Sequence, residues 1–127
     1  MADLAVATIL VVVGLVNLAP VSAARSAAAL ARTYGIPEPG GDIEVLLRHR
    51  AVLFGIVGGV ILVSAIVPAL QFTAVIMAYA SMASYLVLVA MAGKVGHRLV
   101  LVRNIDIAAL VLLTGVPVIW AFTGVPS

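Results

Sequence analysis

The chain of 127 residues is 65% hydrophobic and only 9% charged, whereas an ordinary soluble domain is about 25% charged. Three stretches, residues 4–24, 51–93 and 107–127, contain no Asp, Glu, Lys or Arg, and eleven of the twelve charges lie between them. This distribution excludes a soluble enzyme, a nucleic-acid-binding protein, a disordered tail and a secreted disulfide-linked domain. It predicts an all-α protein that crosses a membrane several times, with residues 1–127 forming a single integral membrane domain.

The first apolar run predicts a membrane helix at residues 4–24, because about 20 apolar residues cross the ~30 Å hydrocarbon core. The start of the chain, Met1-Ala2-Asp3, lacks the basic region of a cleavable signal peptide, so we expect this run to be retained as a span. The Ala-rich residues 22–34 carry Arg25 and Arg32 on one helical face. They are predicted to extend the first helix or to form a short interfacial helix.

Glycines and prolines in residues 35–41 predict a loop, after which Asp42 is the expected N-cap of the second helix, with Glu44 in its first turn. The 43-residue uncharged run at 51–93 is too long for one crossing. It suits two helices, at about 46–68 and 72–92, joined by a turn near Pro68 and Gln71. The last run predicts a fourth helix at about 100–122.

The position of the basic residues predicts the orientation of these four helices. All seven Lys and Arg lie in or beside the connection 25–45 and the connection between the third and fourth helices. Basic loops stay in the cytoplasm. The expected fold is therefore a four-transmembrane-helix bundle of two antiparallel hairpins, with both basic loops cytoplasmic and both termini outside (N-out/C-out).

Small residues predict where helices pack closely. Gly55 and Gly59 form a GxxxG pair, and Ala80 and Ser84 form a second small-xxx-small pair. Small residues allow close backbone approach in lipid. The contacts are expected within the bundle, with a homo-oligomer or a larger membrane complex as the alternative.

The segment Arg48-His49-Arg50 opens the second helix with a cluster of cationic groups. Arg48 shares a helical face with Gly55 and Gly59, so it is predicted to point into the bundle and to pair with Asp106 of the fourth helix. A local pair of Asp106 with Arg103 is the alternative. Glu44, four residues before Arg48, is also suitably placed for an ion pair with it. Arg50 lies about 200° from Arg48 on the helix and is expected to reach lipid phosphates.

Other polar side chains are expected in the same, cytoplasmic half of the bilayer, where they would form a polar interior that opens to the cytoplasm. Convergence from several helices is typical of a binding pocket. The predicted ligand- or headgroup-binding residues are Asn17, Tyr34, Arg48, Arg50, Tyr85, Arg103 and Asn104.

No catalytic residue is assigned, although His49 and Asp106 are candidates for acid–base chemistry. A haem or metal at His49 and His97 is conceivable, but no metal site is predicted, the chain has no cysteine, and no cofactor can be identified. The predicted function is a non-catalytic membrane subunit or lipid-binding module. An alternative is a small membrane enzyme or binding protein that handles a lipophilic substrate with Arg48, His49 and Asp106, and a lesser one is a small transporter. Membrane lipids are the expected partners, and nucleic acid is not.

Three segments resemble a family of small four-helix bacterial membrane proteins: Gly14-Leu15-Val16-Asn17-Leu18-Ala19-Pro20, Tyr34-Gly35-Ile36, and above all residues 46–55, LLRHRAVLFG. Members of this family often carry the label phosphopantetheine adenylyltransferase. The soluble adenylyltransferase has a nucleotide-binding α/β fold, which a chain this short and apolar does not suit. The resemblance therefore implies a multi-pass protein of the bacterial inner membrane and no particular reaction.

Overall fold

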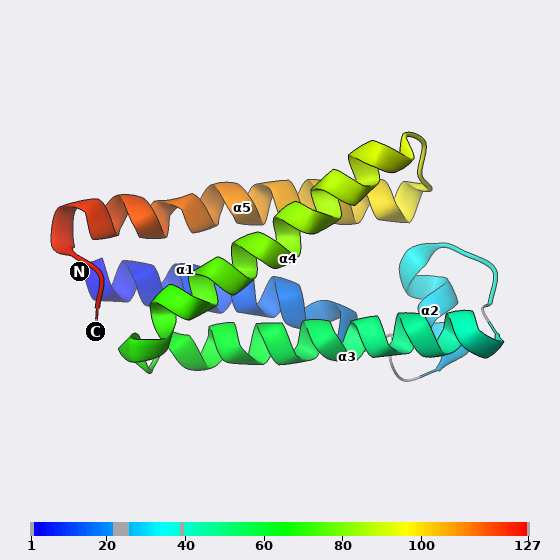
Figure 1. The fold of residues 1–127 in the computed structure, drawn as a ribbon, viewed down its shortest axis with the longest axis horizontal. Helices are drawn as coiled ribbons and strands as arrows, with labels where there is room; N and C mark the ends of the chain where they lie inside the picture. Colours follow the sequence, from blue (N-terminus) through cyan, green and yellow to red (C-terminus); the bar gives the residue numbers. More distant parts are fainter. Residues whose placement is uncertain (1, 22–25, 39, 127) are drawn as a thin grey trace.

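Four long helices form the protein in the computed structural model, which describes residues 2–21, 26–38 and 40–126 (Figure 1). These are α1 (Ala2–Leu18), α3 (Gly41–Ser64), α4 (Gln71–Ala92) and α5 (His97–Thr123), and α2 (Ala27–Tyr34) is a short helix between α1 and α3. Within the described residues, four helical segments are long and apolar enough to cross a membrane. The predicted all-α, four-helix, multi-pass fold is confirmed.

The long helices pack in a ring in the order α1, α3, α4, α5. Both termini and the α3–α4 turn lie at one end of the bundle, and α2 and the starts of α3 and α5 lie at the other (Figure 1). We call the latter the basic end, because Arg32, Arg48, Lys94 and Arg98 are found there. Helix α4 crosses the bundle obliquely, from the end of α3 to the start of α5, so α3 and α4 stand apart at the basic end (Figure 1).

Helix α1 is shorter than the predicted 4–24. It ends at Leu18 and continues as a 3-10 turn through Val21. Pro20 explains this end, because proline lacks an N–H and its ring crowds the carbonyl four residues earlier. Of the two predictions for residues 22–34, the separate helix is correct: Ser26 caps α2 by accepting a bond from the Ala29 N–H at 3.1 Å. Arg25 lies outside the described residues.

The other helix boundaries agree with the prediction to within a few residues. The N-cap of α3 is Gly40, so the predicted cap at Asp42 is wrong, and Asp42 and Glu44 lie in the first turn. Helix α3 ends at Ser64, and the predicted turn follows as a 3-10 segment at Pro68–Leu70 before α4 begins at Gln71. Helix α5 begins at His97, three residues earlier than predicted, behind Gly96 as its N-cap.

Close contact between α1 and α3 depends on Gly14 and Gly58. A Cβ atom on Gly58 would lie 2.8 Å from the Leu18 nitrogen and 2.9 Å from the Gly14 oxygen, whereas a Cβ atom on Gly59 would have no neighbour within 4 Å. The predicted packing residue Gly55 does face α1, because its Cβ would meet the Val21 side chain. The predicted role of Gly59 within the bundle is wrong.

The second predicted small-residue pair also lies on the wrong face. Ala80 and Ser84 are exposed on α4, and Ala74 and Ala78 are buried there instead. Together with large side chains from all four long helices, these alanines form one core cluster: Leu10, Val13, Ile61, Met82, Leu113 and Val116. Contact between copies of the chain through Ala80 and Ser84 stays a prediction.

Candidate functional site

A cavity of about 520 Å³ lies toward the basic end, where α4 has moved away from α3. Ligand pockets typically measure about 300–1,000 Å³. Its walls are mostly apolar and come from α1, the turn after it, α3 and α5. Five polar side chains also line it: Asn17, Thr33, Arg50, Tyr85 and Asp106. The lining residues are Val12, Leu15, Val16, Asn17, Ala19, Pro20, Thr33, Arg50, Phe54, Tyr85, Val102, Ile105 and Asp106.

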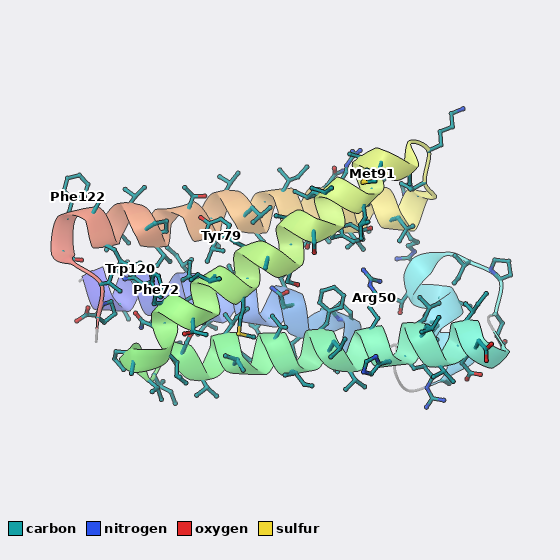
Figure 2. All side chains as sticks on the ribbon, viewed as in Figure 1. Arg50, Phe72, Tyr79, Met91, Trp120 and Phe122 are labelled. Atoms are coloured by element: carbon teal, nitrogen blue, oxygen red, sulfur yellow. The ribbon has the colours of Figure 1, made fainter. Side chains whose placement is uncertain are left out.

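Arg50 extends from α3 into the space between the helices (Figure 2). Its guanidinium carbon lies 4.9 Å from the centre of the Phe54 ring and 5.6 Å from that of the Tyr85 ring. The Tyr85 hydroxyl donates a hydrogen bond of 2.9 Å to the Leu99 carbonyl oxygen. The cation is therefore held by π-contacts with rings from two helices, and one of these rings is itself fixed to the start of α5.

Asp106 places a carboxylate in the same cavity from α5. The residue is only 8% exposed. Among the described residues, no side chain forms a hydrogen bond or an ion pair within 4.0 Å with this carboxylate, although Arg50 attracts it electrostatically. A buried acceptor without a donor is costly, so this carboxylate is a candidate to receive a ligand.

Asn17 contributes the polar wall from α1 and is 3% exposed. Its Nδ2 donates to the Val13 carbonyl oxygen at 3.0 Å, and its Oδ1 accepts a bond of 3.3 Å from the Ser81 hydroxyl of α4. This is a direct polar link across the bundle. Asn17, Arg50 and Tyr85 are the members of the predicted ligand-binding set that the structure brings together, along with Asp106.

Arg48 does not take the predicted position inside the bundle. Its side chain is 45% exposed and pairs with Glu44 at 3.4 Å, in the alternative arrangement that the sequence also allowed. The predicted pair between Arg48 and Asp106 is wrong, and Arg50 is the arginine that shares the cavity with Asp106. The physical reason is the rotation of α3: its buried face contains Ala51, Gly58 and Ile61 and not Gly59.

Arg103 and Asn104 lie beside the cavity and do not line it. The Arg103 Nε and Nη2 donate bonds of 3.3 and 3.1 Å to the Asn104 Oδ1, and Asn104 is exposed. The local pair of Arg103 with Asp106 is therefore absent as well. His49 and His97 are both exposed, and in the described part of the chain there is no group of three metal-ligating side chains. The side chain of Tyr34 lies outside the described residues.

The sequence analysis did not identify the apolar wall of the cavity, nor Phe54, which contacts Arg50, nor the polar side chain of Thr33. Phe54 could have been found from its spacing, since a residue four positions after Arg50 on a helix lies beside it. Thr33 is carried by α2, whose position against α3 and α5 is a tertiary contact.

No family model, curated protein or solved structure matches the chain.

The arrangement has the chemistry to bind an amphiphile. Apolar walls give a place for a hydrocarbon chain, and the cation and the carboxylate give contacts for a polar head. The candidate base His49 lies on the exposed side of α3 and does not line the cavity. The exposed outer faces of the long helices, with Leu88, Val111 and Phe122 more than 60% exposed, fit contact with lipid.

Proposed function

We propose that the protein is a non-catalytic membrane module that binds a lipid in the cavity between its helices. The observation that carries the proposal is the combination of a largely apolar cavity of about 520 Å³ with Arg50 and Asp106 in its wall. In this arrangement, the acyl chain lies along Val12, Leu15 and Phe54, and the polar head contacts the charged side chains. Removal of apolar chain surface from water does not drive this binding, because the lipid leaves an apolar surrounding; shape and polar contacts do.

The proposal includes a location and an orientation. Basic loops favour the cytoplasmic side of a membrane, so the basic end and the cavity near it face the cytoplasm, and both termini face outward. The resemblance to small four-helix bacterial proteins supports placement in the bacterial inner membrane. Assembly into a homo-oligomer or a larger complex through the partly exposed Gly59 and the exposed Ala80 and Ser84 is a further part of the proposal.

Native mass spectrometry of the protein released from its own membrane tests the lipid-binding proposal. Val102 lines the cavity from α5, whereas Val111 on the same helix is 71% exposed. Val102→Phe fills part of the cavity, and Val111→Phe is the matched control on the lipid-facing side. We expect the wild type and Val111→Phe to retain a lipid that survives removal of the annular lipids, and Val102→Phe to lose it.

Two results would contradict the proposal. One is a folded wild-type protein that retains no lipid once the annular lipids have been removed in mild detergent. The other is a bound lipid that Val102→Phe retains as tightly as Val111→Phe does, which would place the lipid on the outer surface. Circular dichroism and gel filtration of each variant establish that a loss of lipid is not a loss of the fold.

A further inference from the structure

The Asp106 carboxylate is the polar group of the cavity that the bundle leaves unsatisfied. Only 8% of the residue is exposed, and it lines the cavity from α5. No hydrogen bond, and no ion pair within 4.0 Å, joins its carboxylate to the described residues. A buried acceptor without a donor is costly, and a charged one inside a membrane protein is costlier still. A bound molecule that donates to this carboxylate therefore stabilises the site.

Two further polar side chains of the wall already bond within the bundle. The Asn17 amide donates to the Val13 carbonyl oxygen at 3.0 Å and accepts from the Ser81 hydroxyl at 3.3 Å. The Tyr85 hydroxyl donates to the Leu99 carbonyl oxygen at 2.9 Å. These bonds hold α1, α4 and α5 together, and they leave the Asp106 carboxylate as the group for a ligand to satisfy.

The charges of the cavity wall already balance. Among the described residues that line it, Arg50 and Asp106 are the charged ones, one of each sign, and the arginine attracts the carboxylate. A ligand with a net charge, positive or negative, would leave one charge without a counterpart in a largely apolar space, which is costly. An uncharged ligand preserves the balance.

A zwitterionic head is neutral as a whole but suits the cavity less well than a hydroxyl. Both of its charges must give up water to enter. Asp106 can accept from an ammonium, but a phosphate needs donors too, and Arg50 is already engaged by the Phe54 and Tyr85 rings at 4.9 and 5.6 Å. A hydroxyl is uncharged, and its O–H suits a carboxylate, which accepts but does not donate.

Resting on the proposed function, we infer that the lipid of the cavity is uncharged and carries a hydroxyl at its polar end, which donates to Asp106. A diacylglycerol and an isoprenoid alcohol share this chemistry. The hydrocarbon lies against apolar wall residues such as Leu15, Val16 and Ile105. The hydroxyl satisfies the carboxylate and leaves the charge balance of the wall unchanged.

Two pairs of probes test this inference: dioleoylglycerol with its methyl ether, and geranylgeraniol with its methyl ether. The members of each pair differ in whether the polar end can donate a hydrogen bond. Each probe is titrated against the delipidated full-length protein, and binding is measured by native mass spectrometry. A hydrogen bond to a charged group corresponds to at least about a tenfold change in affinity. The wild type should therefore bind at least one alcohol about tenfold or more tightly than its ether, and the pair that shows this difference identifies the type of chain.

Two phospholipids with the same acyl chains test the charge of the head. Dioleoyl phosphatidylethanolamine is zwitterionic and dioleoyl phosphatidylglycerol is anionic, and both should bind the wild type more weakly than the preferred alcohol. The reason is that each brings charges into the cavity for which the wall has no further counterpart.

A variant of Asp106 assigns the contact. Asp106→Leu removes the acceptor, so it should bind each alcohol and its ether with equal affinity. Asp42→Leu, the same substitution at an exposed position of α3, should keep the wild-type preference. Should Asp106→Leu not fold, Asp106→Asn takes its place; it should show a smaller preference than the wild type, because its amide oxygen accepts without a charge.

The possible failures are distinguishable. If both ethers bind the wild type as tightly as their alcohols, or if folded Asp106→Leu keeps the preference, the inference is wrong and water in the cavity satisfies the carboxylate. If either phospholipid binds more tightly than both alcohols, the inference is wrong and the cavity takes a charged head. In these cases a lipid still binds, and the proposed function stands. If no probe binds, or if Val102→Phe binds the probes as the wild type does, the proposed function itself fails.

Discussion

Substitution of Gly58 by alanine tests the contact that fixes α3 against α1. A Cβ atom at this position would lie 2.8 Å from the Leu18 nitrogen, 2.9 Å from the Gly14 oxygen and 3.1 Å from the Leu18 Cα. All three are backbone atoms, which cannot rotate away as a side chain can. The two helices must separate to accept the methyl group, and α3 carries Arg50 with it.

Gly59→Ala is the matched control, because a Cβ atom there meets nothing within 4 Å. Both variants gain the same helix propensity, about 1 kcal/mol, so this gain cancels when they are compared. An added methyl group in a close-packed contact costs about 1–3 kcal/mol. We expect the free energy of unfolding of Gly58→Ala to be lower than that of Gly59→Ala by about this amount. Gly55→Ala should lie between them, since its close neighbour is the Val21 side chain.

Unfolding of the purified protein by SDS in mixed micelles measures these differences. The single tryptophan, Trp120, is buried, and its fluorescence reports the transition. Equal stability of Gly58→Ala and Gly59→Ala would refute the packing described here. A lower stability of Gly59→Ala would instead support the GxxxG seam of Gly55 and Gly59.

Three further predictions concern the polar link, the aromatic support and the topology. Ser81→Ala removes the 3.3 Å bond to Asn17 and should lower the free energy of unfolding by about 0.6 kcal/mol, the mean for such bonds in membranes, whereas Ala in place of the exposed Ser84 should change it less. Tyr85→Phe removes the bond to the Leu99 oxygen and should lower the free energy of unfolding by about 0.5–1.5 kcal/mol in the same assay. It should also lower lipid retention. Unchanged lipid retention would contradict the support of Arg50 by a fixed ring. Because the chain lacks cysteine, a cysteine at Thr123 should react with a membrane-impermeant thiol reagent in intact cells, and one at Lys94 only after permeabilisation; the reverse pattern would invert the topology.

The membrane helices could be predicted from the sequence because they depend on local properties. An apolar run of sufficient length predicts a membrane-crossing helix, and Pro68 predicts the turn between the second and third of these helices. The earlier end of α1 also has a local cause, because Pro20 disfavours continuation of the helix to residue 24. These features can be predicted without knowing which helices are neighbours in the bundle.

The rotation of α3 could not be predicted in this way. The three glycines Gly55, Gly58 and Gly59 allow two different packing faces on α3. Which face packs against α1 depends on where Gly14 of α1 contacts α3. One residue on a helix corresponds to about 100°. Taking Gly59 and not Gly58 as the packing glycine therefore predicts Arg48 inside the bundle and Arg50 outside it, whereas in the structure Arg48 is exposed and Arg50 lines the cavity.

The cavity itself follows from the oblique course of α4, which no segment of the sequence encodes alone. Tyr79 bonds to Thr114 at 3.1 Å and Tyr85 bonds to the start of α5, so α4 is attached to α5 along much of its length. This attachment draws α4 away from α3 at the basic end. The bundle thereby forgoes helix contacts at the basic end, where it also buries the Asp106 carboxylate. Both features oppose stability, and a ligand that fills the space and donates hydrogen bonds to this carboxylate offsets both at once.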